Sequence, residues 1–509
     1  MKIHPIKKVP QLFLIFVFLF SIGFSKAQNH AEKPRTIVTT DGEIDDVDSF
    51  IRMLLYANEF QIEGLVYSSS MWHYKGDGKG TTFVSEMDMT KEMYGAKTDL
   101  RWPGTQWMQG LISAYDKIYP KLSTHAEGFP TANHLLSLIK VGNIDFEGEM
   151  EKDTEGSNFI KAKLLDSTVQ PIYLQVWGGT NTIARALKSI EDEFKNTAQW
   201  KEVYKKVSTK AILFTILDQD ATYKKYIANA WPDIKVFYNS NQFWSLAYNW
   251  KKAIPGEWHQ YLEGEFMGKN IINGHGPLTK MYYSYGDGQK QEGDDDHLHG
   301  DPTKLENAQW GTFGKYDFIS EGDSPAFLHL IDVGLDNLEH PNYGGWGGRL
   351  IQSDTNPNRW EDGEEVAEYN PFTQKMDNAF PQTRWIKALQ MDFAARADWC
   401  VNSYEDANHA PTVQLNHAGQ LTVKPGTTVN LSGQATDPDG DNLTYRWWQY
   451  KEVGSYKGDV SISNSGTPDA IVTIPASIEK GETVHFILEV SDDRFPNMTR
   501  YQRVILMSE

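Results

Sequence analysis

Short apolar runs alternate with helical patterns along the first half of the chain, and this alternation most limits its fold. Runs rich in β-branched residues predict strands at 36–38, 62–67, 171–176, 211–216 and 235–238. Apolar residues at helical spacing predict helices at 107–119, 134–139, 182–194 and 222–230. Such an order is typical of a mostly parallel open sheet with helices on both faces. We therefore expect residues 34–400 to form one α/β domain with large loop insertions.

The texture of the sequence changes near residue 405. From 405 to 509, short alternating strands follow one another, with turn signals between them and no helical period. About a hundred residues of this kind predict an all-β, immunoglobulin-like sandwich, here without a cysteine pair. DPDGD at 437–441 has carboxylates that suit calcium, although acid-and-glycine turns are also ordinary hairpin chemistry, which is the favoured interpretation.

The amino terminus has the pattern of a secretory signal peptide. Residues 1–27 combine lysines, an apolar run from Leu12 to Phe24 and a small-residue cleavage site that ends at Ala27. The run is too short for a comfortable membrane span, so we expect a secreted or periplasmic protein without membrane insertion after cleavage. The single cysteine, Cys400, excludes an internal disulfide.

Charge and aromatic content restrict the partners. Removal of residues 1–27, which carry four lysines and no acids, changes the formal net charge from −19 to −23. This charge disfavours nucleic acid and anionic membranes. The chain has 16 tryptophans, and several lie in glycine-rich loops, where they suit carbohydrate better than core packing.

An acidic turn follows the first predicted strand. TTDGEIDDVDSF at 39–50 places Asp41, Asp45 and Asp46 between that strand and a helical pattern. Open α/β sheets bind ligands at the carboxyl ends of their strands. Acids that converge there repel one another unless a hard cation such as calcium offsets the repulsion. Alternatively, the acids favour the dipole of the following helix.

Three motifs resemble nucleoside hydrolases. The stretch from Asp41 to Asp46 resembles their calcium-binding D-x-D-P-G-x-D-D turn, although Thr39 replaces the first aspartate and Gly42-Glu43 replaces Pro-Gly. QVWGGTNTIARAL at 175–187 resembles their G-P-L-T-N-I-A segment, and EGDSPAFLHLI at 321–331 resembles their late H-D-P-x-A segment. The resemblance implies a calcium ion held by Asp41, Asp46, the carbonyl of Thr180, and Asp323.

A closer resemblance covers nearly the whole chain. The stretch from EGDSPAF to GGWGGRL at 321–350, DQDA at 218–221, GHGPL at 274–278 and DPDGDNLTYRWWQY at 437–450 are similar to a bacterial secreted family. Its members are described as cellulose-binding proteins with a nucleoside hydrolase-like amino-terminal domain and a β-sandwich carboxyl-terminal domain. This resemblance implies a carbohydrate or glycoside ligand.

The nucleoside hydrolase pattern also implies roles in catalysis. Asp41 would deprotonate a water, Asp45 would hold a sugar hydroxyl, and Asp323 would share metal and hydroxyl contacts. Gly322 stands where some members have a histidine, so the acid that protonates the leaving group is open. Its candidates are Glu321, His340, His275, Asp218 and Asp220.

Other residues are assigned to the substrate. Ser70 follows the second predicted strand, where nucleoside hydrolases place a sugar-contacting asparagine. The remaining candidates are Asn181, Asp220, Trp346 as a stacking platform, and Arg349 as a polar anchor. Trp346 equally fits a tight loop whose tryptophan fills the core. The segment EGDDDHLHGD at 292–301 resembles a metal site in composition, but a solvated insertion is the favoured interpretation.

The sequence therefore predicts a secreted, calcium-dependent hydrolase of glycosidic bonds, acting on O-glycosides of carbohydrates. Two alternatives stay open. One is a non-catalytic protein that binds a cellulose-like polysaccharide, and the other is a nucleoside N-ribohydrolase. The sugar, the anomeric outcome and the oligomeric state are not determined, although an oligomer is compatible with the nucleoside hydrolase pattern.

Overall fold

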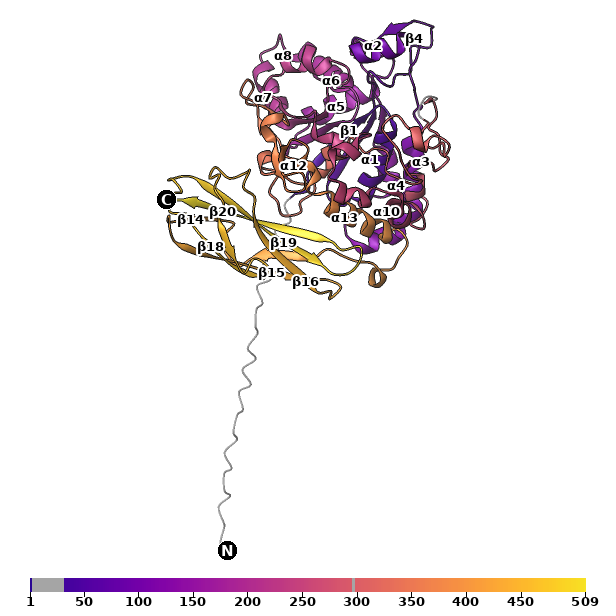
Figure 1. Ribbon diagram of the computed structural model, residues 1–509. Helices are drawn as coiled ribbons and strands as arrows, with labels where there is room; N and C mark the ends of the chain where they lie inside the picture. The colour runs from indigo at the N-terminus through magenta and orange to yellow at the C-terminus, as the bar shows by residue number, and fades with distance from the viewer. Residues whose placement is uncertain (2–31, 295–297) are drawn as a thin grey trace. The chain divides into compact units, whose positions relative to one another are not determined.

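The first part of the chain is built on one eight-stranded sheet (Figure 1). All neighbouring strands in it pair in parallel, except the edge pair β10 and β9. In spatial order the strands are β5 (Ile139–Val141), β2 (Gln61–Tyr67), β1 (Arg35–Thr40), β6 (Ile172–Val176), β7 (Ala211–Ile216), β8 (Lys235–Asn239), β10 (Arg359–Glu361) and β9 (Ile351–Gln352). The predicted mostly parallel α/β sheet is thus confirmed, and each strand predicted from the sequence lies in it.

The computed structural model describes residue 1 and residues 32–294 and 298–509. The predicted signal peptide and its cleavage site after Ala27 lie outside the described residues, apart from Met1. Residues 34–509 form one compact unit. No helix among the residues described is both long and apolar enough to cross a bilayer.

Helices cover both faces of the sheet because successive strand side chains point to opposite faces. Ile37 of β1 packs into one apolar cluster, whereas its neighbour Val38 packs into the other. The cluster that contains Val38 is completed by α1 (Ile44–Leu55), α3 (Trp107–His125), α11 (Ser324–Leu328) and α13 (Ile386–Trp399). The cluster that contains Ile37 is completed by α5 (Glu155–Leu165), α6 (Asn181–Phe194) and α7 (Trp200–Lys210).

Two predicted helices differ from the observed ones. The helix predicted at 134–139 is α4 (Ala132–Ser137), and it ends early because Ile139 pairs with Leu65 as the first residue of β5. The helix predicted at 222–230 begins as a π-helical turn at Tyr223–Ile227 and ends as α8 (Ala228–Ala230). In the first case, pairing with a strand far away in the sequence ends the helix. Local periodicity does not reveal such pairing.

Shorter elements lie in the insertions. They include β3 (Phe83–Val84), α2 (Asp88–Tyr94), β4 (Ala96–Lys97), a 3₁₀ turn at Gly256–Tyr261, α9 (Trp250–Ala253), α10 (Gly264–Met267), β11 (Glu368–Asn370), β12 (Lys375–Asp377) and α12 (Phe380–Thr383). Among the described residues of the long stretch between β8 and β9, none forms a further strand of the main sheet.

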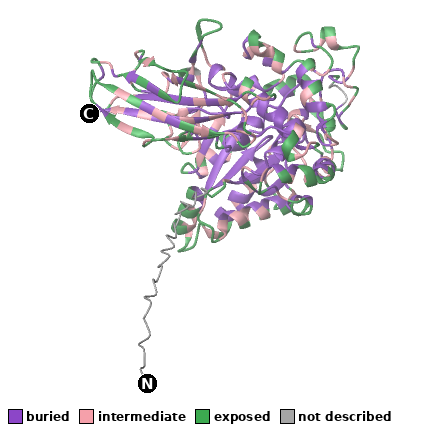
Figure 2. Cartoon of the chain, turned by 90° about the horizontal axis from the view of Figure 1, so that it is seen from below, coloured by how far each residue is buried: buried purple, intermediate pink, exposed green. Residues whose placement is uncertain are grey.

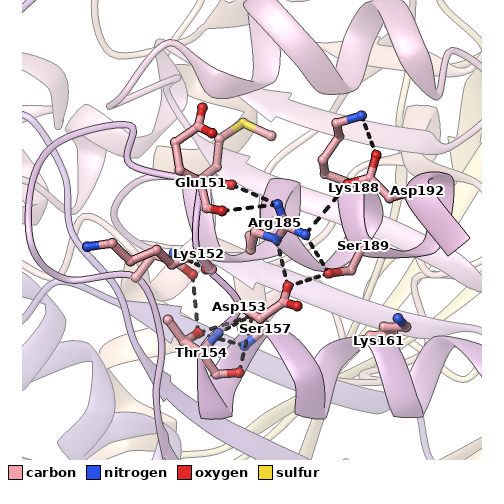
Figure 3. Close-up of polar contacts among 12 residues, drawn as sticks. Glu151, Lys152, Asp153, Thr154, Ser157, Lys161, Arg185, Lys188, Ser189 and Asp192 are labelled. Carbon is pink, nitrogen blue, oxygen red and sulfur yellow. Dashed lines mark hydrogen bonds and ion pairs between the residues drawn. The ribbon is translucent and has the colours of Figure 1, made fainter.

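A polar network holds the start of α5 against α6 (Figure 3). The Arg185 Nε of α6 donates to Asp153 Oδ1 at 2.7 Å, and Ser189 also donates to this carboxylate. Thr154 caps α5 in a reciprocal pair with Ser157. The loop at 177–180 joins β6 to α6, so this network anchors the helix in which that loop ends.

The carboxyl-terminal part is a sandwich of two four-stranded sheets. One sheet contains β13 (Thr412–Leu415), β15 (Thr428–Thr436), β18 (Asp469–Thr473) and β17 (Ser461–Ser463), and the other contains β14 (Gln420–Val423), β20 (Thr499–Ser508), β19 (Thr483–Asp492) and β16 (Leu443–Gln449). Buried and exposed residues alternate along β18, as expected for a strand with one face on a core (Figure 2). The predicted β-sandwich is confirmed.

Buried polar contacts join the sandwich to the rest of the compact unit. Arg500 Nη1 donates to Asp392 Oδ2 of α13 at 2.8 Å. Arg503 donates to the carbonyls of Leu335 and Tyr343, at 2.9 Å each. His485 is 3 % exposed, and its Nδ1 lies 3.3 Å from Arg503 Nη1. Burial lowers the pKa of His485 to about 3, and the arginine adds to this effect.

This buried histidine predicts acid sensitivity. Because its folded pKa is depressed, the unfolded chain takes up a proton below its ordinary pKa of 6.5 and the native chain does not. We expect the free energy of unfolding to fall, relative to His485→Gln, by about 1.4 kcal/mol per pH unit as pH drops from 6.5 towards 3. Denaturant titrations at several pH values measure this difference. The exposed His134→Gln should follow the parent curve, and a His485→Gln curve parallel to the parent would contradict the prediction.

Candidate metal and glycoside site

Acidic residues from distant parts of the chain meet at the carboxyl edge of the sheet. Asp41 follows β1, Asp45 and Asp46 lie in the first turn of α1, and Asp323 immediately precedes α11. Asp45, Asp46 and Asp323 each present a carboxylate oxygen, and these oxygens all lie within 4.8 Å of one another. The structure therefore brings the late aspartate to the amino-terminal acids. We call Asp41, Asp45, Asp46 and Asp323 the aspartate cluster.

Most of this negative charge is buried. Asp41 and Asp46 are 1 % exposed and Asp323 is 2 % exposed, whereas Asp45 is half-buried. Burial raises the pKa of Asp41 to about 7, with a further contribution from Glu43. Burial, and then the charge of Asp41, raise the pKa of Asp45 to about 7. Burial and the neighbouring carboxylates also raise the pKa values of Asp46 and Asp323 well above the ordinary range.

Neutral donors satisfy only part of the cluster. Thr40 donates to Asp46, and Ser320 lies 3.4 Å from Asp45 Oδ2. Asp41 Oδ2 is buried without a hydrogen-bond partner. Within the described chain, no lysine or arginine forms an ion pair with any of the four acids. Clustered oxygen ligands with an unsatisfied carboxylate atom fit a hard divalent cation, and calcium prefers such ligands.

The loop after β6 approaches the cluster through a glycine. A Cβ added at Gly178 would lie 2.8 Å from Asp41 Cγ, so a larger residue would collide with that carboxylate. The Thr180 carbonyl accepts the Ala184 N–H in the first turn of α6 at 2.8 Å. The Thr180 hydroxyl lies 3.3 Å from Asp220 Oδ1. A calcium contact from the Thr180 carbonyl stays a prediction, and it would need the second lone pair of that oxygen.

Ser70 is the predicted substrate residue that contacts Asp41. Its hydroxyl forms a hydrogen bond that partly offsets the raised pKa of Asp41. The same oxygen accepts the Trp72 N–H at 2.9 Å, so the turn after β2 fixes its position.

Asn181 and Asp220 are engaged by the protein itself. The Asn181 amide donates to Ser69 Oγ and to the Asn143 carbonyl, at 2.9 Å each. Asp220 Oδ2 accepts the Asn181 N–H at 2.8 Å, and Asp220 Oδ1 accepts from Thr222. These bonds tie the loops after β2, β6 and β7 together. The structure thus gives both residues a positioning role.

Glu321 is not available as the proposed general acid. It is fully buried, and its two carboxylate oxygens accept from Arg52 Nε at 2.5 Å and Nη2 at 2.9 Å. Tyr282 and Ser324 donate to the same carboxylate. Because donors from the protein occupy both oxygens, this buried carboxylate is not presented to a substrate. Gly322, in contrast, lies at the cluster, since a Cβ there would be 2.6 Å from Asp45 Oδ2.

His340 and His275 also have structural neighbours. His340 is exposed, and its ring stacks on Tyr343 with centroids 4.4 Å apart; Tyr343 in turn packs against His485 of the sandwich. His275 Nδ1 lies 3.2 Å from Asp398 Oδ1 near the end of α13. Neither has a recorded contact with the aspartate cluster.

The glycine-rich loop at 344–349 belongs to the core. Trp346 is 1 % exposed, so neither face of its ring can stack on a sugar. Arg349 is also buried, and its Nε donates to Glu368 Oε1 at 2.6 Å. The structure matches the core-filling interpretation of Trp346 and replaces the polar-anchor role of Arg349 with a buried ion pair.

Sequence reasoning missed residues that lie beside the acidic turn or in the insertion at 292–301. Tyr248 donates to Glu43 Oε1 at 2.9 Å, and its ring lies nearly parallel to that of Trp310, with centroids 6.3 Å apart. Asp294, expected in a solvated insertion, is fully buried and bonds Arg101 at 2.8 Å; that expectation is wrong at this residue. No local pattern pairs Arg101 with an acid so far along the chain.

Sequence reasoning also missed Glu147, an acidic residue at the carboxyl edge of the sheet. Glu147 is 5 % exposed and lines a cavity of about 350 Å³ together with Asp220. Burial raises the pKa of Glu147 to about 7, and Asp220 contributes to the increase. A carboxyl group in this range is partly protonated near neutral pH, as a general acid requires. The sequence signal was an acid in the FEGE loop after β5, which composition alone did not single out.

Two family models match the chain. One, described as "Cellulose-binding Sde182, nucleoside hydrolase-like domain", matches residues 35–350. The other, described as "Cellulose-binding protein Sde0182, C-terminal domain", matches residues 428–508. No curated protein matches the chain.

Solved structures extend the comparison. A nucleoside hydrolase-related hypothetical protein from Saccharophagus degradans, described as associated with carbohydrate metabolism, is 27 % identical, with a TM-score of 0.67; the match covers 94 % of this chain and 100 % of that one. A plant nucleoside hydrolase is 10 % identical, with a TM-score of 0.29, over 65 % of this chain and 86 % of its own. The first of these structures supports the fold over nearly the full length.

The aspartate cluster predicts that removing one of its charges raises the stability of the metal-free protein and lowers its affinity for metal. Asp323→Asn removes one buried like charge and one oxygen ligand, so the metal-free protein should become more stable and calcium affinity should fall ~10-fold or more. Calorimetric calcium titration and melting curves with and without chelator measure both effects. The exposed Asp332→Asn is the matched control, and unchanged calcium affinity in Asp323→Asn would remove Asp323 from the site.

The Arg52–Glu321 ion pair yields a separate prediction. Glu321→Gln leaves the buried guanidinium without its counter-charge, which should lower the free energy of unfolding by roughly 3–5 kcal/mol. Denaturant unfolding measures the loss. A general acid would behave differently, because its amide variant would lose turnover and keep its stability.

Proposed function

This chain belongs to the Sde182 family of cellulose-binding proteins with a nucleoside hydrolase-like domain, and from that membership we propose an exported, calcium-dependent hydrolase of glycosidic bonds in carbohydrates. The observation that carries the proposal is the buried aspartate cluster, in which Asp323 meets Asp45 and Asp46 at the carboxyl edge of the sheet. The nucleoside hydrolase-like fold supplies that edge, and the family description supports a carbohydrate ligand.

The role proposed for each acid of the cluster follows from its exposure to solvent. Asp46 and Asp323 are buried and would hold the ion with Asp41, together with the Thr180 carbonyl. A bound calcium ion supplies positive charge that offsets the carboxylate repulsion and makes a nearby water easier to deprotonate. Asp41 Oδ2, the unsatisfied atom, would accept the proton. Half-buried Asp45 is reachable by a sugar hydroxyl, and Ser70 holds Asp41 in position.

The leaving group needs a proton when the glycosidic C–O bond breaks. Donors from the protein, Arg52 among them, occupy both oxygens of buried Glu321, so Glu321 does not supply it. Glu147 meets the protonation requirement, because its pKa of about 7 leaves it partly protonated at neutral pH. It also lines a cavity at the same edge of the sheet. We therefore make Glu147 the candidate donor in place of Glu321 and His340.

A non-catalytic role is the second candidate. The observation that favours it is that Arg52 binds both oxygens of Glu321. The segment before Asp323 therefore offers no carboxyl group to a substrate. In that case the aspartate cluster would bind sugar hydroxyls through calcium without breaking a bond. Retention on polysaccharide without release of reducing sugar would support this function.

Asp41→Asn tests the catalytic proposal. It keeps the shape of the side chain and removes the base, so turnover should fall ~10²-fold or more while the fold stays intact. Release of reducing sugar from aryl glycosides and a polysaccharide panel, with and without chelator, measures the effect. Exposed Asp116→Asn on α3 is the matched control. Unchanged rates in Asp41→Asn would exclude Asp41 as the general base. Release of the nucleobase from inosine would favour a nucleosidase.

A further inference from the structure

A second cavity lies apart from the aspartate cluster, between α12–α13 and the sandwich. Its volume is about 430 Å³. It is lined by the 3₁₀ turn at 256–261, the β11–β12 hairpin, α12 and α13 on one side, and by β16, β19 and β20 on the other. No member of the aspartate cluster lines it. Whatever binds here is therefore held by a different set of side chains.

Aromatic rings form much of the lining. Trp258 is half-buried and packs edge-on against Phe372, with centroids 4.8 Å apart, and nearly parallel to Phe380 at 6.3 Å. On the sandwich side, Trp448 lies 6.2 Å from Trp385 of the α13 segment. Three tryptophans from separate parts of the chain thus contribute to one cavity.

Trp448 is held in a fixed orientation. Its Nε1 donates to Glu489 Oε2 at 3.1 Å, and the same carboxylate oxygen accepts from Arg446 at 2.7 Å. The Arg384 guanidinium lies 4.8 Å from the ring centroid. A ring fixed by such contacts loses little conformational entropy when a ligand stacks on it.

The hairpin keeps apolar side chains in solvent. Tyr369 is 50 % exposed and Phe372 is 39 % exposed, and both line the cavity. Nearby Met376 of β12 is 61 % exposed. Large apolar side chains gathered at the rim of a concave surface mark a binding site more often than core packing does.

Most charges in the cavity are paired within the protein, and Lys387, which also lines it, adds one positive charge. Arg446 pairs with Glu489, and Arg384 pairs with Glu368 at 2.6 Å. The remaining polar lining includes Ser491, Asn497 and Thr499, which offer hydroxyl and amide groups. A lining made mainly of rings, neutral hydrogen-bonding groups and paired charges, with Lys387 as the remaining cation, does not favour a small ion. It suits a neutral ligand with apolar faces and many hydroxyls.

We propose that this cavity binds an uncharged β-linked glucan chain, at a site separate from the aspartate cluster. In a β-1,4-glucan the hydroxyls are equatorial, so each ring presents flat C–H faces to aromatic side chains and hydroxyls at its edges. The choice of glucan rests on the proposed function, which supplies the carbohydrate class. The cavity itself is independent of calcium and of Asp41, so it would hold the polymer while the aspartate cluster acts on it.

Cellohexaose binding to the full chain, measured by calorimetry, tests the proposal. Trp448→Ala and Trp258→Ala should each weaken binding at least tenfold. Phe372→Ala, at a position that is 39 % exposed, should weaken it severalfold. Phe495→Ala is the matched control, because Phe495 is 59 % exposed and does not line the cavity. Melting curves confirm that each variant is folded.

The outcomes separate this site from the proposed catalysis. Cellohexaose binding that survives chelator and Asp41→Asn, but is lost in Trp448→Ala, supports the cavity even if no substrate is turned over. Trp448→Ala should still cleave any small aryl glycoside that the parent cleaves. Equal binding by the parent, Trp448→Ala and Phe372→Ala would overturn the proposal. So would absence of cellohexaose binding by the parent, or preference for an anionic chain such as polygalacturonate.

Discussion

The buried ion pair between Arg52 and Glu321 holds together the two segments on which the candidate site depends. Arg52 belongs to α1, whose first turn carries Asp45 and Asp46, and Glu321 lies two residues before Asp323. Ser324 donates to Glu321 and also contacts Ser49 of α1 at 3.2 Å. Fixing these neighbours brings like-charged carboxylates together, although their repulsion alone would drive them apart.

This arrangement makes the candidate site electrostatically unfavourable in the absence of a cation. Asp41, Asp46 and Asp323 are buried away from water, and Asp41 Oδ2 has no donor. A protein holds such a group because the surrounding packing over-determines its position, and strained or unsatisfied groups gather at functional sites. A divalent ion is the simplest means of offsetting that cost, and the same charge would help Asp41 to activate a water.

The two proposed sites differ in the physics of recognition. The aspartate cluster is polar, buried and charged, and it is built from loops at the carboxyl edge of a parallel sheet. The second cavity is largely aromatic, most of its charges are paired, and the sandwich contributes one wall. A polymer ligand benefits from such a division, because binding energy from remote sugar units positions the reacting bond without participating in the reaction. The sandwich thereby gains a role beyond that of an appended module.

Particular residues show how far sequence reasoning reached. Asp41, Asp45 and Asp46 were identifiable because neighbouring residues encode a strand, a turn and a helix. Trp346 was misassigned as a sugar platform because a glycine-rich loop looks alike whether it is exposed or buried. Glu321 looked like a free acid because its partner Arg52 lies far away in the chain.

The sequence by itself determined the alternation of strands and helices, the change to a β-sandwich, and the acidic turn after β1, since each depends on residues only a few positions apart. Only the tertiary structure decided that Asp323 lies beside that turn, that Arg52 forms an ion pair with Glu321, and that Trp258 and Trp448 line one cavity. The physical reason is that burial and partner choice depend on contacts between distant segments, and these exist only once the chain has folded.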